Sequence, residues 1–176
     1  MKKTDVPSVL KEMRGKDYQQ QLAIDVNVSR ETISKYENGR SKLPADIGRA
    51  FTKKYDNPKF AITLRNEYTG TGPRWLDGPN VDLHRSSVKE KTIEEMREAL
   101  DKLEQLSLAK PLCKINGFEK QDIETTLEEL VELQTALDHM VAVVCMEADI
   151  SYTGLWDKHY RYLTSVGYLD GGGTVQ

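Results

Sequence analysis

The sequence predicts an all-α protein built from two parts with a connecting segment between them. Apolar residues recur three and four positions apart along most of the chain, and the alternation typical of strands is absent. The segment YTGTGPRWLDGPN, residues 68–80, interrupts this period with glycines and prolines. Residues 1–75 carry 15 Lys and Arg against 9 Asp and Glu, a net charge of +6, whereas residues 76–176 carry 10 against 19, a net of −9. A basic part followed by an acidic one indicates that only the first part meets a polyanion.

These observations divide the chain into four sections. We expect a first domain over residues 1–68, a linker over 69–87, a helical domain over 88–170 and a frayed tail over 171–176. Trp75 and Leu76 are not typical of a linker, so part of this segment should pack against one of the domains.

The composition favours a soluble, cytoplasmic protein. The 176 residues are 38% hydrophobic and 30% charged, and no apolar run reaches the length of roughly 20 that spans a bilayer. The first residues are basic but lack the apolar stretch of a secretory signal. Only two cysteines occur, Cys113 and Cys145, which excludes a disulfide framework and suits a reducing compartment. We expect Cys145 to be a small core residue.

Five short helices are expected in the first part. Asp17 and Gln20 have the spacing of a capping box, and Ser29 is a favourable N-cap residue. Proline suits the first turn of a helix because its missing N–H would have no partner there. The expected starts are Val6, Tyr18, the residue after Ser29, Pro44 and Asn57-Pro58.

The second part has longer helical patterns. Ile93, Met96, Leu100 and Leu103 recur at spacings of 3, 4 and 3, and a seam with unbroken heptad spacing follows. A helix of about 30 residues would run roughly 45 Å, and it must bury this seam against its own neighbours or a second chain. A further helix is expected after Thr153-Gly154. The seam consists of Ile123, Leu127, Leu130, Gln134, Leu137, Val141, Val144 and Ala148.

The stretch QQQLAIDVNVSRETISKYENGR, residues 19–40, is typical of two short helices that meet at a tight turn. Asn27 lies where the turn needs a residue that tolerates positive φ. Apolar side chains should lock the helices together, leaving a polar outward face on the second helix. The locking residues are Leu22, Ala23, Val28, Ile33 and Tyr36, and the outward residues are Arg30, Glu31, Ser34 and Lys35.

This stretch resembles the phage repressor/Cro (Xre) helix-turn-helix family over about residues 6–68. Two departures are Asn27 in place of the usual turn glycine and a one-residue-longer SKLP after the motif, which could shift loop contacts. The C-terminal part resembles no family that we recognise. The resemblance is carried by Gln19, Leu22-Ala23, Val28-Ser29, Ile33-Ser34-Lys35-Tyr36, Glu37-Asn38-Gly39-Arg40 and Pro44.

The resemblance implies that the third helix lies in the major groove of double-stranded DNA, led by its N-terminal residues. Arg30 would offer a fork to guanine, and Glu31 would either accept from cytosine N4 or pair with Arg30. The implied base-reading residues are Arg30, Glu31, Thr32, Ser34 and Lys35. The implied phosphate contacts are Gln19, Ser29, Asn38, Arg40 and Lys42, which fix register without reading sequence.

Structural roles compete with some of these assignments. Ser29 can cap its helix as well as contact DNA, and Thr32 can point either inward or toward a base. Glu37 is expected to pair with an arginine of the same domain. Lys53, Lys54 and Lys59 are expected to be solvated charges.

Proteins of this type bind as dimers to half-sites about one DNA turn apart. The seam residues from Ile123 to Val144 are therefore expected to form a homodimer interface, with Gln134 setting the register. The alternative is a bundle within one chain. An acidic face should point away from DNA, toward solvent or a basic partner; it consists of Glu119, Asp122, Glu124, Glu128, Glu129, Glu132 and Asp138.

The sequence thus favours a DNA-binding transcriptional regulator, a repressor of phage or mobile-element type, with a protein antirepressor or a small ligand left open as the releasing signal. The alternative is an antitoxin or adaptor whose acidic helical part binds a protein partner. His139 and His159 belong to no HExxH or ExxH pair, and no nucleophile–base motif occurs. We therefore expect no catalytic residues, no metal and no cofactor.

Overall fold

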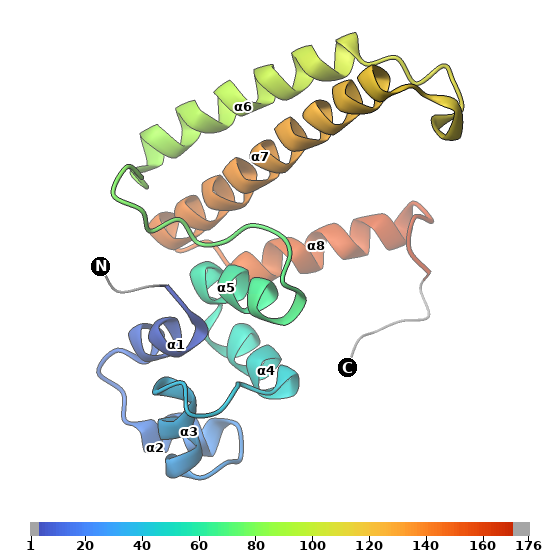
Figure 1. Ribbon diagram of the computed structural model, residues 1–176. Helices are drawn as coiled ribbons and strands as arrows, with labels where there is room; N and C mark the ends of the chain where they lie inside the picture. Colours follow the sequence, from blue (N-terminus) through green and yellow to red (C-terminus); the bar gives the residue numbers. More distant parts are fainter. Residues whose placement is uncertain (1–3, 171–176) are drawn as a thin grey trace. The chain divides into compact units, whose positions relative to one another are not determined.

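The computed structural model describes residues 4–170, and these residues form helices joined by turns with no strand among them (Figure 1). The predicted all-α fold is confirmed. The expected frayed tail, residues 171–176, lies outside the described residues. The helices are α1 Val6–Arg14, α2 Gln19–Asp25, α3 Arg30–Glu37, α4 Ala45–Tyr55, α5 Pro58–Thr69, α6 Arg85–Gln105, α7 Gly117–Ala148 and α8 Tyr152–Ser165, with a short 3-10 turn, η1, at Leu112–Lys114.

Local capping explains most of the helix starts. The Asp5 carboxylate accepts from the Ser8 backbone N–H at 2.9 Å and begins α1. Ser29 accepts from the Thr32 N–H at 3.2 Å and begins α3, as predicted. The capping box predicted at Asp17 is wrong, because α2 begins after Tyr18 without a side-chain cap. Pro44 is the N-cap residue of α4 and so precedes the first turn.

The chain forms two compact units whose division differs from the expected one. Among the described residues, one unit contains Ile62–Val144 with Thr4, and the other contains Asp5–Ala61 with residues 145–170. Helix α8 therefore belongs to the unit of α1–α4 and not to a domain over residues 88–170. A hydrogen bond from the Thr153 N–H to the Asp56 carboxylate, at 2.7 Å, ties α8 to the end of α4.

Within the first of these units, α6 and α7 lie side by side as an antiparallel hairpin (Figure 1). The side that α6 buries consists of Val88, Thr92, Glu95 and Ala99. The Thr92 hydroxyl lies 2.7 Å from the Val88 carbonyl and 3.3 Å from the Ala136 carbonyl of α7. The residues that α6 buries on this side are therefore mostly small or polar.

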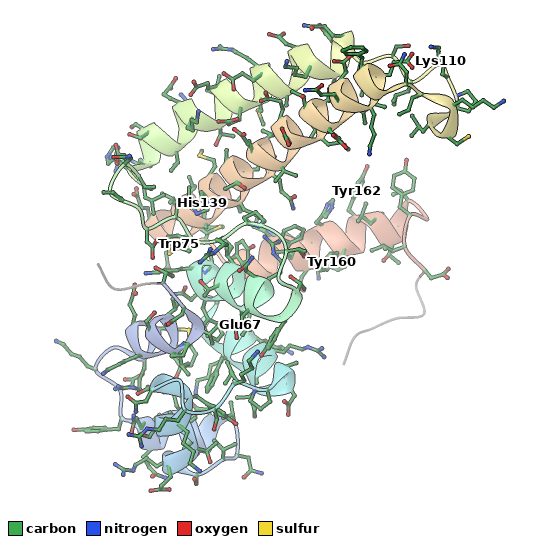
Figure 2. All side chains as sticks on the ribbon, viewed as in Figure 1. Glu67, Trp75, Lys110, His139, Tyr160 and Tyr162 are labelled. Atoms are coloured by element: carbon green, nitrogen blue, oxygen red, sulfur yellow. The ribbon has the colours of Figure 1, made fainter. Side chains whose placement is uncertain are left out.

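The linker packs against α7 in the same unit, as the presence of Trp75 and Leu76 predicted (Figure 2). The Leu76 N–H donates to Nε2 of His139 at 3.1 Å, and Nδ1 of the same ring lies 2.8 Å from the Thr135 carbonyl. Since Nε2 accepts, Nδ1 carries the proton and donates. The Trp75 ring centroid lies 5.2 Å from that of His139. This buried histidine thus holds the linker on the helix.

None of the helices in the described part of the chain is long and apolar enough to cross a membrane.

Candidate nucleic-acid interface

The turn between α2 and α3 fixes the angle of the two helices. Asn27 has φ of 53°, which confirms the expected left-handed residue. The Val28 N–H donates to the Ala23 carbonyl at 2.9 Å and closes the turn. Leu22, Ala23 and Ile33 are each 0% exposed, so α3 is held against α2 by a dry contact.

A buried ion pair joins α1, α2 and α3. The Arg14 guanidinium donates to the Glu37 carboxylate at 2.6 Å through Nε, and Gln19 Nε2 donates to the same carboxylate at 2.7 Å. The Glu37 side chain is only 2% exposed. The hydrogen bond to Glu37 raises the pKa of Arg14 above its ordinary value. The expected structural role of Glu37 is confirmed, and removing one partner of such a pair typically costs about 3–5 kcal/mol.

The outward side of α3 presents charge to solvent. Arg30, Glu31 and Lys35 are exposed. Arg30 Nε lies 3.6 Å from Glu31 Oε1, so the pairing alternative for Glu31 is the one observed. Hydrogen bonds from its own backbone N–H and from the Ser29 hydroxyl lower the pKa of the Glu31 carboxyl. Glu31 therefore brings a negative charge to the front of the helix.

Thr32 and Ser34 are half-buried and take part in local hydrogen bonds. The Thr32 hydroxyl lies 3.0 Å from that of Ser29, at the start of the helix. The Ser34 hydroxyl lies 3.3 Å from Nδ2 of Asn38. Both side chains thus contribute to the ends of α3 as well as flanking its charged residues.

The five expected phosphate contacts separate into two groups. Arg40, Lys42 and Ser29 are exposed, although Ser29 also caps α3. The Gln19 amide is committed to Glu37, and the Asn38 amide donates to the Ser34 carbonyl at 2.7 Å. Each of these amides therefore uses one N–H within the fold and has a second N–H, so phosphate contact by Gln19 and Asn38 stays a prediction.

Two of the three lysines expected to be solvated are paired instead. Lys54 forms an ion pair with Asp25, and Lys59 Nζ lies 2.7 Å from Oε2 of Glu12. The hydrogen bond from Lys54 is the main cause that lowers the pKa of Asp25. These pairs connect α2 to α4 and α1 to α5, so the lysines act within the fold.

The predicted seam of α7 is not the side that packs on α6. Leu127 is 53% exposed and Val141 is 39% exposed, and Gln134 is exposed as well. Leu137 is also exposed at 36%, whereas Ile123, Leu130 and Val144 are half-buried. The hairpin therefore leaves part of the seam along α7 exposed, namely Leu127, Gln134, Leu137 and Val141.

A matching stripe runs along α6, where Met96, Leu100 and Leu103 are exposed. Met96 directly follows Glu95 and Leu100 directly follows Ala99, two residues of the buried side of α6. On α7, Leu127 directly follows buried Thr126 in the same way. One position rotates a side chain by about 100° around the helix. Because the helices are antiparallel, this rotation brings both stripes to the same side of the hairpin. We call this surface the apolar face; it consists of Met96, Leu100, Leu103, Leu127, Gln134, Leu137 and Val141.

The hairpin also gathers groups that sequence reasoning missed. One carboxylate oxygen from each of Glu95, Glu129 and Glu132 lies within 4.8 Å of the other two. Glu95 is far from the other two along the chain, so only the register of α6 against α7 brings them together. The sequence places Glu129 and Glu132 on the acidic face expected to point toward solvent or a basic partner, and no spacing motif marks them as ligands.

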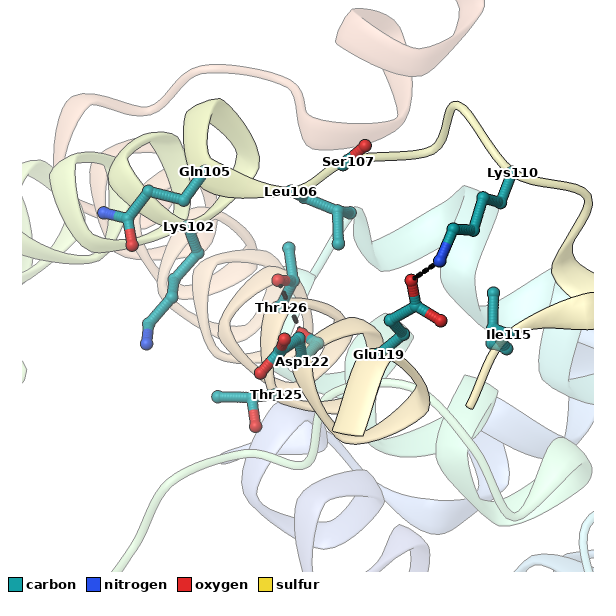
Figure 3. Close-up of a pocket in the computed structure, with 10 residues that line it drawn as sticks. All are labelled: Lys102, Gln105, Leu106, Ser107, Lys110, Ile115, Glu119, Asp122, Thr125 and Thr126. Carbon is teal, nitrogen blue, oxygen red and sulfur yellow. Dashed lines mark hydrogen bonds and ion pairs between the residues drawn. The ribbon is translucent and has the colours of Figure 1, made fainter. Parts of the chain in front are cut away.

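A cavity of about 400 Å³ lies at the end of the hairpin where the connecting segment joins α6 to α7 (Figure 3). Its walls are mixed, with Leu106 and Ile115 beside charged side chains. Lys110 Nζ lies 2.5 Å from Oε1 of Glu119 on one wall, and this contact lowers the pKa of Glu119. The volume suits a small molecule, but two of the charged wall residues, Lys110 and Glu119, already pair with each other.

Comparisons with models of known protein families, with curated proteins and with solved structures found no match for this chain. The function is therefore argued from the residues and geometry alone.

Proposed function

We propose that this chain is a sequence-specific DNA-binding regulator of the repressor type, which inserts α3 into the major groove and acts as a dimer on a two-fold symmetric operator. The observation that carries the proposal is the two-sided character of α3. Arg30, Glu31 and Lys35 are exposed on one side, while Ile33 on the other is fully buried. A short helix held rigidly with a charged outer side is what major-groove reading needs.

The way α3 is held supports this proposal. Ser29 caps its start, and Glu37 ties its end to Arg14 and Gln19. Base reading depends on bidentate contacts, which tolerate little movement of the side chain that makes them. The cap and the buried ion pair restrict that movement at both ends of α3.

The distribution of charge supports DNA as the partner. Residues 1–75 carry a net charge of +6, and exposed Arg40 and Lys42 follow α3 directly in the chain. Phosphate contacts by such residues supply most of the affinity and make it dependent on salt. Arg30 must break its ion pair with Glu31 to reach a base edge. This costs little free energy, because the pair is exposed to solvent and its two atoms are 3.6 Å apart.

The test begins with selection of bound sequences from random DNA at a fixed salt concentration, followed by titration of the selected fragment. Arg30→Ala is expected to cost about 1–3 kcal/mol and to relax preference at one base pair. Arg40→Ala is expected to weaken binding to all sequences alike and to lower the salt slope by about one. Arg97→Ala is the matched control, because it removes the same charge from an exposed site on α6.

Unchanged affinity in both Arg30→Ala and Arg40→Ala would overturn the docking of α3. A chain that selects no sequence but co-purifies with a basic protein at 1:1 would instead support the antitoxin or adaptor function. The acidic residues of α7 and the apolar face are the features that such a partner would contact.

A further inference from the structure

We propose that Glu95, Glu129 and Glu132 form a binding site for one hard divalent cation, of the Mg²⁺, Mn²⁺ or Ca²⁺ class, between α6 and α7. Glu95 comes from α6, and the other two come from adjacent turns of α7. Spacing of three along a helix places Glu129 and Glu132 on one face. The site would therefore bridge the two helices of the hairpin.

The spacing of the three carboxylates suits a single ion. One oxygen from each group lies within 4.8 Å of the others. Two ligands on opposite sides of Ca²⁺ are roughly 4.8 Å apart, and neighbouring ligands are closer. All three oxygens can therefore touch one ion with small side-chain adjustments, leaving its remaining positions to water.

The burial of Glu95 is the second observation that points to a ligand. This residue is 3% exposed, and its Oε2 atom is buried without a hydrogen-bond partner in the described part of the chain. A buried carboxylate oxygen normally has a partner, because leaving it without one costs free energy. A cation would supply that partner and would explain why a glutamate occupies the side of α6 that packs on α7.

Lys91 pairs with one carboxylate of the cluster. Its Nζ atom lies 2.7 Å from Oε1 of Glu95 and 3.0 Å from Oε2 of Glu94. This one ammonium is therefore shared between Glu95 and a carboxylate beside the cluster. The Lys91 side chain is 57% exposed and can turn away to solvent. It is the natural competitor of a bound cation.

The donor set selects the type of ion. Carboxylate oxygens without histidine or cysteine are the ligands of Mg²⁺, Ca²⁺ and Mn²⁺, whereas zinc sites generally include nitrogen or sulfur. His139 lies on the same helix, but both its ring nitrogens are engaged.

The test is a titration of the full chain with Mn²⁺, in which electron paramagnetic resonance measures the concentration of the free ion. The titration is repeated with Ca²⁺, Mg²⁺ and Zn²⁺ as competitors. We expect one Mn²⁺ per chain to bind below about 1 mM, the weak end of the range for oxygen-ligand sites. Glu132→Gln, which is exposed and should leave the fold intact, is expected to weaken binding at least about tenfold. Glu95→Gln should do the same.

Two further variants make the result decisive. Glu128→Gln removes the same charge from an exposed position outside the cluster and should leave Mn²⁺ affinity unchanged. Lys91→Met removes the competing ammonium and should tighten binding several-fold, a gain that a damaged fold cannot produce. Absence of binding at 1 mM, equal weakening by Glu128→Gln and Glu132→Gln, or no gain in Lys91→Met would each overturn the proposal.

Discussion

The negative charge of Glu31, at the N-terminal end of α3, has two opposed consequences for the proposed DNA binding. Its carboxylate pairs with Arg30 in the free protein, and hydrogen bonds from its own N–H and the Ser29 hydroxyl lower its pKa. These hydrogen bonds favour the negatively charged form of the carboxyl. A carboxylate beside a phosphate backbone reduces affinity unless it accepts a hydrogen bond from a base. One substitution separates these two roles.

Glu31→Gln is expected to strengthen binding to every duplex by roughly three- to tenfold, because a repulsive unit charge is removed near the phosphates. Fluorescence anisotropy with a selected and an unrelated fragment at equal salt would measure it. Asp46→Asn, an exposed change of the same charge in the first turn of α4, is the control. Weaker binding to the selected fragment alone would show that Glu31 reads a base and that pairing with Arg30 is not its main role.

Single residues also show what the sequence could predict at the candidate site. The Ser29 cap and the structural Glu37 follow from local chemistry, and both expectations are confirmed. The hydrogen-bond partners of Gln19 and Asn38 do not follow from local chemistry, because an amide can donate equally well to phosphate, to a carboxylate or to a helix carbonyl. Only the tertiary placement of Glu37 and the geometry at the end of α3 decide between these acceptors.

At the scale of elements, periodicity predicted the helices better than their contacts. The starts of α1, α3 and α5 match expectation, since each has a local signal, whereas α2 starts one residue after the expected Tyr18 and lacks the expected capping box. The heptad seam predicted a long helix correctly but did not predict which side meets α6. The hairpin instead packs through Thr92, Ala99 and Thr126, whose small side chains allow a close approach. The neighbouring large apolar residues therefore remain exposed.

The attachment of α8 to α4 is a contact between elements that depends on one carboxylate. Burial acts to raise the pKa of Asp56, but hydrogen bonds from the Ser151 hydroxyl and the Thr153 N–H outweigh it, and the pKa is lowered. A carboxylate with a lowered pKa in the fold stabilises it above the ordinary aspartate value, and this contribution is lost as pH falls through the folded pKa. Acid should therefore loosen α8 first at its N-terminus.

In a nuclear magnetic resonance titration, the amide resonance of Thr153 reports the protonation of Asp56 directly, because the Thr153 N–H donates to the Asp56 carboxylate. We expect its shift to follow a protonation with a midpoint below the ordinary value of 3.8. Asp56→Asn should abolish that pH dependence, whereas Asp46→Asn should leave it intact. A Thr153 resonance that is insensitive to pH in the unaltered chain would contradict the role given to Asp56.

At the scale of the whole molecule, a unit proposed to bind DNA and a helical hairpin are combined in a chain with a basic N-terminal part and an acidic C-terminal part. A single domain of this size contacts too few base pairs to be highly specific. A pair of domains on two half-sites overcomes this limit, provided that something other than DNA holds the two chains together. The apolar face is the surface best suited to that task, because exposed apolar stripes of this length usually mark an interface.

We therefore expect the full chain to be a dimer joined through the apolar face of two hairpins. Leu100→Glu and Leu127→Glu place a carboxylate at positions 54% and 53% exposed, so the fold of one chain should tolerate them while the dimer should not. Leu112→Glu is the matched control, since Leu112 is 57% exposed but lies on η1, outside the apolar face. Analytical ultracentrifugation should give twice the chain mass of 20.0 kDa for the unaltered chain and the control, and the single mass for the other two.

The two monomeric variants should also lose affinity for a two-fold symmetric fragment while keeping the weaker affinity for a half-site. A monomeric unaltered chain that still binds the symmetric fragment cooperatively would mean that DNA itself brings the chains together, and the apolar face would then have to be assigned to a different protein.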